Sequence, residues 1–273
     1  MNFFKVKEMM KKDFVSIMKI CVLVLLVMLL CYVPGCKKTD DGDSENPEHP
    51  SAGEHPTTKT PVAKETKDEK STEPAGMVPI EIKLPKPMFV GTPQSTKVPN
   101  LEKPLGKPRP PFLAPVGTTN VALGKPIASS DEEPIIGDIE MITDGDMEAA
   151  DGSYVELGPF TQHVTVDLEG MHNIYVILIW HYHKQARVYY DVVVQVADDA
   201  DFITNVRTLF NNDHDNSSGL GVGEDMHYTE TNEGKLINAK GVKARYVRLY
   251  SNGNTGNDLN HYIEVAVYGK PAQ

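Results

Sequence analysis

The run Ile174-Tyr175-Val176-Ile177-Leu178-Ile179-Trp180 is apolar at almost every position and rich in β-branched side chains. Such residues favour strands, and an apolar run without polar alternation is typical of a strand that is covered on both faces. We therefore expect a central strand at residues 174–180, inside a sheet that is packed from both sides.

The segments around this run also have the pattern of strands. Val164, Val166 and Leu168 alternate with polar neighbours, as in a half-buried strand. Clusters of Gly, Asn and Asp separate four further expected strands, at residues 188–196, 206–210, 244–250 and 261–268. No segment keeps a helical period over ten residues. Short strands at this spacing predict an all-β fold, either a β-sandwich or a jelly roll.

The first 35 residues are typical of an export signal. Five lysines precede an apolar run at residues 20–33, which is shorter than the roughly 20 residues that a membrane-spanning helix needs. The run ends in Val33-Pro34-Gly35-Cys36, which resembles a bacterial lipobox. That resemblance implies cleavage before Cys36, a lipid on its thiol, and a membrane anchor on the exported side of the cell envelope (outer membrane or periplasmic face). The alternative is an uncut anchor with a buried, inert cysteine.

Two segments of unusual composition connect this leader to the apparent sandwich. Residues 36–75 hold almost no large apolar side chains, so we expect a disordered tether. Residues 76–118 thread apolar residues among prolines, which favours extended segments over helix. This Pro-rich bridge either docks on the domain surface or acts as a second flexible linker.

Charge and cysteine usage exclude several classes. The formal net charge is −11, which argues against nucleic acid as a partner because phosphate binding needs a basic face. All three cysteines lie in the first 36 residues, so the sandwich can form no disulfide.

Four motifs then occur in the order found in one family. They are residues 120–126 (NVALGKP), residues 142–146 (ITDGD), residues 244–250 (ARYVRLY) and residues 261–269 (HYIEVAVYG). Together they resemble the galactose-binding-like, or discoidin (coagulation factor 5/8 type C), domains, over residues 119–271. The resemblance implies a jelly-roll sandwich. A tryptophan that usually follows the Asp-Gly turn is absent here, where Tyr154 is the nearest aromatic residue.

The resemblance also implies a calcium site that joins the two ends of the sandwich. Calcium prefers six to eight oxygen ligands. Mapped by position, the ligands would be Asp144, the carbonyl of Asp146, Ser153 and Glu264, with the carbonyls of Met141 and Ile263 as further candidates. The alternative is that Asp144 only caps its own turn, while Glu264 faces solvent.

A saccharide site is implied at residues 180–187, where a strand leaves the sheet into a loop. The candidate ligand-binding residues are Trp180, His181, His183 and Arg187, with Asn211 on the opposite wall. Two alternatives remain for this run. Trp180 and Tyr182 would be core residues with His181 and His183 on the surface, or the two imidazoles would bind zinc, although no third ligand is evident.

These observations predict a non-catalytic, membrane-anchored lipoprotein with a calcium-stabilised sandwich that binds glycans or glycoconjugates. The alternative is a structural module of the envelope that binds proteins and has no sugar ligand. An enzyme would need an acid–base pair facing one cleft, and the sequence offers no motif for one.

Overall fold

The computed structural model describes residues 76–88 and 97–273. The export signal, Cys36 and the tether expected before residue 76 lie outside this part of the chain. Within it, no helix has the length and apolarity needed to cross a bilayer. The helical structure in these residues is a short 3-10 turn, η2 (Ile139–Thr143).

A seven-stranded antiparallel sheet forms most of the domain. The strand order is β3-β11-β6-β9-β7-β8, and β4 pairs with β6 beside this path. The strands are β3 (Thr119–Asn120), β4 (Ile127–Ser129), β6 (Gln162–Trp180), β7 (Val193–Ala197), β8 (Arg207–Asn211), β9 (Lys235–Ser251) and β11 (Glu264–Pro271).

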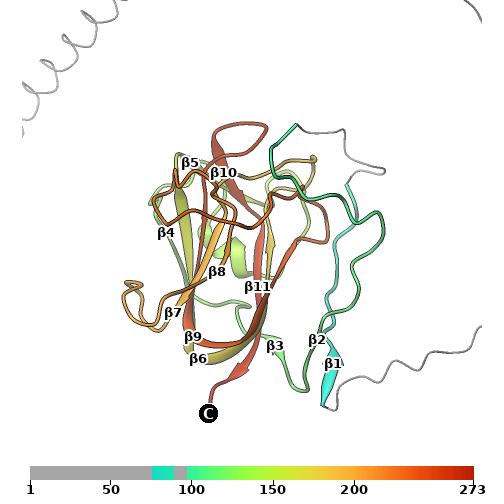
Figure 1. The fold of residues 1–273 in the computed structure, drawn as a ribbon, viewed down its shortest axis with the longest axis vertical. Coiled ribbons are helices and arrows are strands. Elements are labelled where there is room, and N and C mark those ends of the chain that lie inside the picture. The colour runs from blue at the N-terminus through green and yellow to red at the C-terminus, as the bar shows by residue number, and fades with distance from the viewer. Residues whose placement is uncertain (1–75, 89–96) are drawn as a thin grey trace, which may run out of the picture. The chain divides into compact units, whose positions relative to one another are not determined.

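Strands β6 and β9 are long enough to belong to both layers of the sandwich. Gln162 at the start of β6 lies opposite Ser251, and Ile179 near its end lies opposite Lys235. The register shifts between Asp167 and His172, where both strands curve together at the lower end of Figure 1. We call this the bend end. At the opposite, loop end, β5 (Val155–Pro159) pairs with β10 (Leu259–Tyr262).

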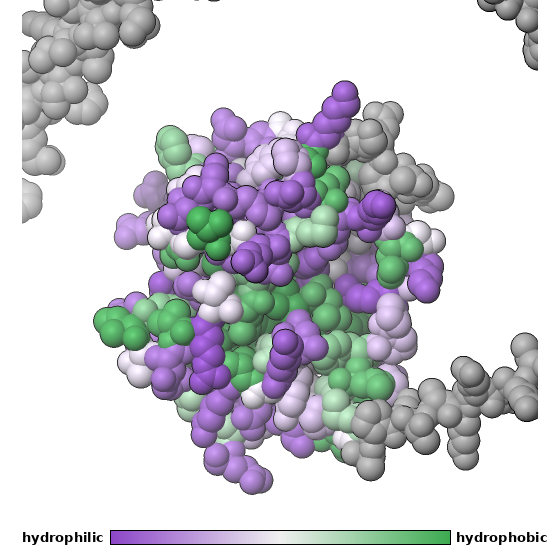
Figure 2. All heavy atoms as spheres, in the orientation of Figure 1, coloured by the Kyte–Doolittle hydropathy of each residue, from purple (hydrophilic) through white to green (hydrophobic). Residues whose placement is uncertain are grey.

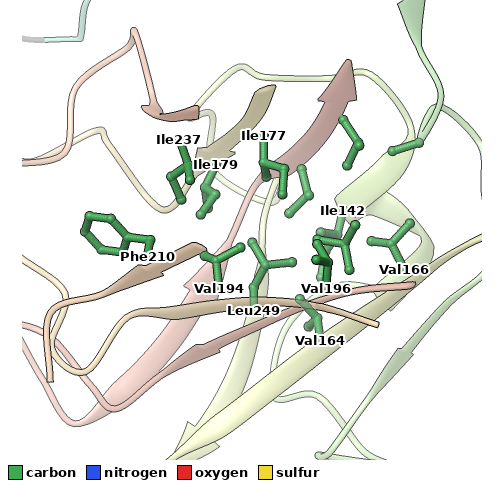
Figure 3. Packing of buried hydrophobic residues seen from close by; sticks show 14 of the residues in the cluster. Ile142, Val164, Val166, Ile177, Ile179, Val194, Val196, Phe210, Ile237 and Leu249 are labelled. Carbon is green, nitrogen blue, oxygen red and sulfur yellow. The ribbon is translucent and has the colours of Figure 1, made fainter. Parts of the chain in front are cut away.

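The main core lies between the two layers. Ile177, Ile179 and Ile237 from one layer face Val194, Val196 and Leu249 from the other (Figure 3). Val164, Val166 and Leu168 belong to the same cluster, as their alternation predicts. The all-β sandwich expected from the sequence is therefore confirmed.

The Pro-rich bridge covers the outer face of one layer. Alternate residues of β6, Val176, Leu178 and Trp180, point away from the main core into a second cluster, against which Ile80, Ile82 and Phe112 pack. Strands β1 (Met77–Pro79) and β2 (Leu113–Pro115) pair with each other. We call residues 76–88 and 97–115 the strap. Its docking explains why the run at 174–180 is apolar on both faces.

Several expected strands have different bounds in the structure. The segments expected at 164–168 and 174–180 form the single strand β6, and the strand expected at 244–250 is part of the longer β9. The strand expected at 188–196 begins only at Val193, because the chain turns at Asp191, whose φ is +51°. The closing segment at 261–268 is divided, since β10 ends at Tyr262 and β11 begins at Glu264. The division lets the chain pass from the β5–β10 pair into the main sheet.

Candidate functional site

Three of the predicted ligand-binding residues lie in the interior. Trp180, His181 and His183 are each fully buried. Trp180 Nε1 donates to the carbonyl of Asn232 at 3.0 Å, and His183 Nε2 lies 3.0 Å from the carbonyl of Met147. Because the strap and the neighbouring loops cover this end of β6, these rings do not reach the surface where a sugar would bind. The alternative is confirmed for Trp180 and Tyr182, which are core residues, and is wrong for His181 and His183, which are buried and not at the surface.

His181 belongs to a buried polar pair. Its Nδ1 lies 2.6 Å from Oε1 of Glu230, and both side chains are buried. The imidazole stacks on the ring of Tyr189 with centroids 4.4 Å apart. His181 and His183 thus have different polar partners, and they do not form a common zinc site.

Arg187 is the one basic residue of the predicted set that reaches the surface in part. Its Nε and Nη2 donate to Oε1 of the exposed Gln185, at 3.3 and 3.2 Å. Its Cζ lies 5.0 Å from the centroid of the Tyr182 ring. Nη1 is buried and has no hydrogen-bond partner. A Cβ at Gly256 would approach Nε to 3.2 Å, so a glycine there allows the loop to lie against the guanidinium.

Aromatic rings and a carboxylate surround this guanidinium. The Tyr154 and Tyr182 rings lie 4.8 Å apart, and Tyr154 is 5.8 Å from the ring of His261. His261 connects Tyr189, whose hydroxyl is 3.0 Å from Nδ1, to Glu156, whose Oε2 is 2.9 Å from Nε2.

Electrostatics keep the His261 imidazole neutral. Burial, with Arg187 and His181 nearby, lowers the pKa of His261 to about 4. Burial raises the pKa of Glu156, which Arg187 opposes. We therefore assign the contact as a neutral imidazole N–H donating to the Glu156 carboxylate, with the Tyr189 hydroxyl donating to Nδ1.

Asn211 orders a loop and does not offer its amide to a ligand. Its Nδ2 donates to the carbonyl of Gly221 at 2.9 Å, and its Oδ1 accepts from the amide of Asp213 at 2.8 Å. The Asp225 carboxylate accepts from its backbone N–H at 2.7 Å. The predicted role on the opposite wall is therefore replaced by a role in folding residues 211–225.

The same loop completes a group of carboxylates that could hold a metal ion. Asp191, Asp213 and Asp215 each bring an oxygen within 4.8 Å of the others. Asp191 accepts from Ser217 Oγ at 2.6 Å and from Asn252 Nδ2 at 2.8 Å. This group is not evident from the sequence because Asp191 is more than 20 residues from the other two in the chain.

Of the predicted calcium ligands, the turn with Asp144 and Asp146 lies beside Glu264, the first residue of β11. Glu264 is fully buried, its Oε2 accepts from the amide of Gly145 at 3.1 Å, and its Oε1 has no hydrogen-bond partner. Burial raises the pKa of Glu264 to about 8; the Gly145 amide opposes this, and Asp144 and Asp146 add to it. The alternative in which Glu264 faces solvent is wrong.

The other members of the predicted calcium set lie in η2 and the turn after it, next to Glu264, and, for Ser153, in a separate turn before β5. Asp144 Oδ1 accepts from the amide of Asp146 at 2.7 Å, so Asp144 also caps its own turn. The carbonyl of Met141 accepts from Asp144 N at 3.4 Å, and the amide of Ser153 donates to the carbonyl of Ala150 at 3.1 Å. Ile263 directly precedes Glu264, and its amide donates to the carbonyl of Trp180 at 2.8 Å. A buried carboxylate with an unpartnered oxygen beside two exposed aspartates fits a hard cation.

One exposed aromatic residue at the loop end was also missed. Phe160, between β5 and β6, is 80% exposed and has a φ of +69°. The buried amide of Asn260 donates to the carbonyls of Gly158 at 2.8 Å and Phe160 at 2.9 Å. Bulky residues rarely adopt this backbone conformation. The hydrogen bonds from Asn260 therefore hold the turn in a strained conformation, in which the Phe160 ring is exposed to solvent. In Figure 2, hydrophilic side chains dominate the loops at this upper end.

Comparisons with known proteins find likeness in structure only. No family model matches the chain, and no curated protein matches it. Among solved structures, the chain is similar to CpGH89CBM32-4 of Clostridium perfringens, solved with GlcNAc-alpha-1,4-galactose, at 16% identity and a TM-score of 0.41 over 57% of this chain and 96% of that one. It is also similar to SpX-3, a fucose-binding module of Streptococcus pneumoniae, at 16% identity and a TM-score of 0.39 over 55% and 97%.

A third similar structure is the CBM32 of AlyQ, solved with 4,5-unsaturated mannuronic acid, at 17% identity and a TM-score of 0.38 over 52% of this chain and 92% of that one. The chain also matches a family 89 glycoside hydrolase of Clostridium perfringens, of which it covers only 15%. At this level of similarity, the ligand of one protein says nothing about the ligand of another.

Proposed function

We propose that this chain is a non-catalytic, glycan-binding protein whose loop end takes a saccharide at Arg187. The observation that carries the proposal is the Arg187 guanidinium, which lies over an aromatic ring while its Nη1 is buried without an acceptor. An unpartnered buried donor costs about 1–3 kcal/mol. A ligand hydroxyl or carboxylate would replace the exposed Gln185 side chain as the acceptor of Nε and Nη2, beside the donor that has no partner.

The surrounding rings suit the apolar face of a sugar. The half-buried Tyr154 lies beside the Tyr182 ring that Arg187 covers. Tyr182 itself is buried, so the rings open to a sugar are Tyr154 and the exposed Phe160, which follows β5. Tyrosine offers both a flat apolar surface and a hydroxyl, the combination that saccharide recognition needs. The polar pairs beneath these rings, Glu156–His261 and Glu230–His181, are buried and support the site from below.

We place calcium at Glu264, Asp144 and Asp146, with the carbonyls of Met141, Asp146 and Ile263 and the hydroxyl of Ser153 as further ligands. The unpartnered Glu264 Oε1 supports this assignment. Bound calcium would tie β11 to the turn after η2 and stabilise the fold, with no chemical step. The Asp191, Asp213 and Asp215 group is a second candidate for the cation.

The cellular setting follows from the leader. Lipid attachment at Cys36 would hold the domain on the exported side of the envelope, in the outer membrane or on the periplasmic face. Glycans or glycoconjugates would be the partners. The second candidate function is a protein-binding module of the envelope, which the absence of the tryptophan after the Asp-Gly turn favours.

A glycan array with the full chain separates the two functions. The array should include fucosides, GlcNAc-terminated galactosides and uronates, read with calcium and with chelator. We expect binding that Arg187→Ala reduces by at least tenfold, while Arg207→Ala, an exposed arginine on β8, leaves it unchanged. Binding to no glycan, or equal binding by Arg187→Ala, would refute the saccharide site. Phase partitioning in detergent of wild type against Cys36→Ala tests the lipid anchor separately.

A further inference from the structure

Residues 227–235 form a largely irregular segment that contacts buried residues of the loop end. Glu230 at its centre is fully buried. Its amide donates to the carbonyl of Arg187 at 2.8 Å, and its Oε1 lies 2.6 Å from His181 Nδ1. The position of the Arg187 main chain therefore depends on the position of this segment.

The backbone of this segment finds many of its partners in the strap. His227 donates its amide to the carbonyl of Asn100 at 3.0 Å, and its carbonyl accepts from the amide of Glu102 at 2.8 Å. Arg109 donates through Nη1 to the carbonyl of Gly234 and through Nη2 to that of Glu233, both at 2.8 Å. Because buried backbone groups need partners, the strap takes the place of a neighbouring strand.

Side chains reinforce the same contact. Asn232 Nδ2 donates to the carbonyl of Pro85 at 3.0 Å, which connects the other arm of the strap to the segment. The Glu233 carboxylate accepts from the amide of Arg109 at 3.1 Å. Lys235 Nζ lies 2.9 Å from Glu102 Oε2. Both arms of the strap therefore hold residues 227–235.

The two arms of the strap are joined to each other, and the strap and the sandwich carry opposite net charges. Pairing of β1 with β2 closes its lower end. Residues 76–118 carry six basic and two acidic side chains, whereas residues 119–273 carry ten basic and 24 acidic ones. A basic strap on an acidic sandwich gains from this opposite charge, and its apolar residues pack on the outer face of β6.

We infer that the strap is a positioning element for the ligand-binding end. It holds residues 227–235, and through Glu230 it fixes the main chain of Arg187 and the ring of His181. The expected effect of the strap on ligand affinity rests on the proposed function. The bracing of residues 227–235 rests only on the contacts described above. Arg109 is its central positioning residue, since its guanidinium spans two successive carbonyls.

The test combines hydrogen exchange with glycan binding in the full chain. Arg109→Ala should speed amide exchange in residues 227–235 by on the order of tenfold or more, because local opening becomes easier. Affinity for a glycan found on the array should fall by a similar factor. Lys107→Ala, an exposed neighbour, is the matched control and should change neither. Arg109→Lys keeps the charge and loses the fork geometry, so it should show the same effects more weakly.

The outcomes separate the two proposals. Unchanged exchange in residues 227–235 of Arg109→Ala would overturn the bracing. Faster exchange with unchanged affinity would overturn the positioning of Arg187. A wild-type protein that binds no glycan would refute the proposed function, and amide exchange in residues 227–235 would still decide the bracing. If Arg109→Ala does not fold, Arg109→Lys decides by the same criteria.

Discussion

The carboxylate of Glu230 lies 2.6 Å from Nδ1 of His181, and both side chains are buried beneath the loop end. Each partner leaves one polar atom without a hydrogen bond, Oε2 of Glu230 and Nε2 of His181. The Tyr228 hydroxyl, 3.5 Å from His181 Nδ1, is the one further polar group within hydrogen-bond distance of the pair among the described residues.

Removal of one partner from this pair should destabilise the domain strongly. We expect Glu230→Ala to lower the free energy of unfolding by about 1–3 kcal/mol, because it leaves the buried imidazole with only the Tyr228 hydroxyl, 3.5 Å from Nδ1. Urea denaturation at pH 7 measures the change. Glu224→Ala, at an exposed position of the same loop, should stay within about 0.5 kcal/mol of wild type. A loss below 1 kcal/mol in Glu230→Ala would mean that the pair contributes little.

Calcium should raise the melting temperature through Glu264. At a hundredfold excess over its dissociation constant, a ligand of the folded state adds about 2.7 kcal/mol, or roughly 5–10 °C for a domain of this size. Glu264→Gln should abolish the shift, since the neutral amide cannot replace the carboxylate ligand. Calorimetry with calcium and with chelator measures it. If Asp213→Asn abolishes the shift while Glu264→Gln keeps it, the cation belongs to the Asp191 group.

Acid should destabilise the domain through His261. The pKa of this imidazole is lowered to about 4 in the folded state, against about 6.5 in the unfolded chain. Between these values the unfolded state binds the extra proton, so stability falls as the pH drops from 6.5 to 4, by about 3 kcal/mol. His261→Gln should flatten this part of the stability profile. A profile of the same steepness in the variant would exclude His261 as the cause.

Two substitutions at Phe160 should distinguish the strain of its backbone from a contact between its ring and a sugar. Glycine adopts positive φ without penalty, and the exposed ring makes few packing contacts, so Phe160→Gly should raise the free energy of unfolding by about 1 kcal/mol. Phe160→Ala keeps the strained backbone and should gain nothing. If the ring packs on a sugar, both variants should weaken glycan binding equally. If both variants bind glycan with wild-type affinity, the Phe160 ring does not contact the ligand.

The central strand and the β-sandwich could be predicted from sequence because their signals are local. The apolar run at 174–180 predicts burial on both faces, and the alternation at Val164, Val166 and Leu168 predicts a half-buried strand. Glu264 could be placed beside Asp144 through the order of four motifs. The residues that cover Trp180 could not be predicted from the sequence. The composition of residues 76–118 is equally compatible with a docked segment and with a flexible linker.

The errors at the loop end share one cause. Polar side chains at a strand exit were expected at the surface, but His181 and His183 are buried because Glu230 and the Met147 carbonyl, which are distant in sequence, supply their partners. The same long-range pairing hides the group formed by Asp191, Asp213 and Asp215, as well as the Glu156–His261–Tyr189 chain. Composition around a single residue does not reveal such partners.

The route of the chain at the bend end has a practical consequence. The carbonyl of Gly76 accepts from the amide of Val116, whose own carbonyl accepts from Lys270 Nζ, close to the C-terminal residues (Figure 1). From there β11 runs eight residues to Glu264 at the opposite pole. A biotin or a sensor-chip linker attached after Gln273 would therefore immobilise the molecule by its base, and leave Arg187, Phe160 and the Glu264 turn facing the analyte stream.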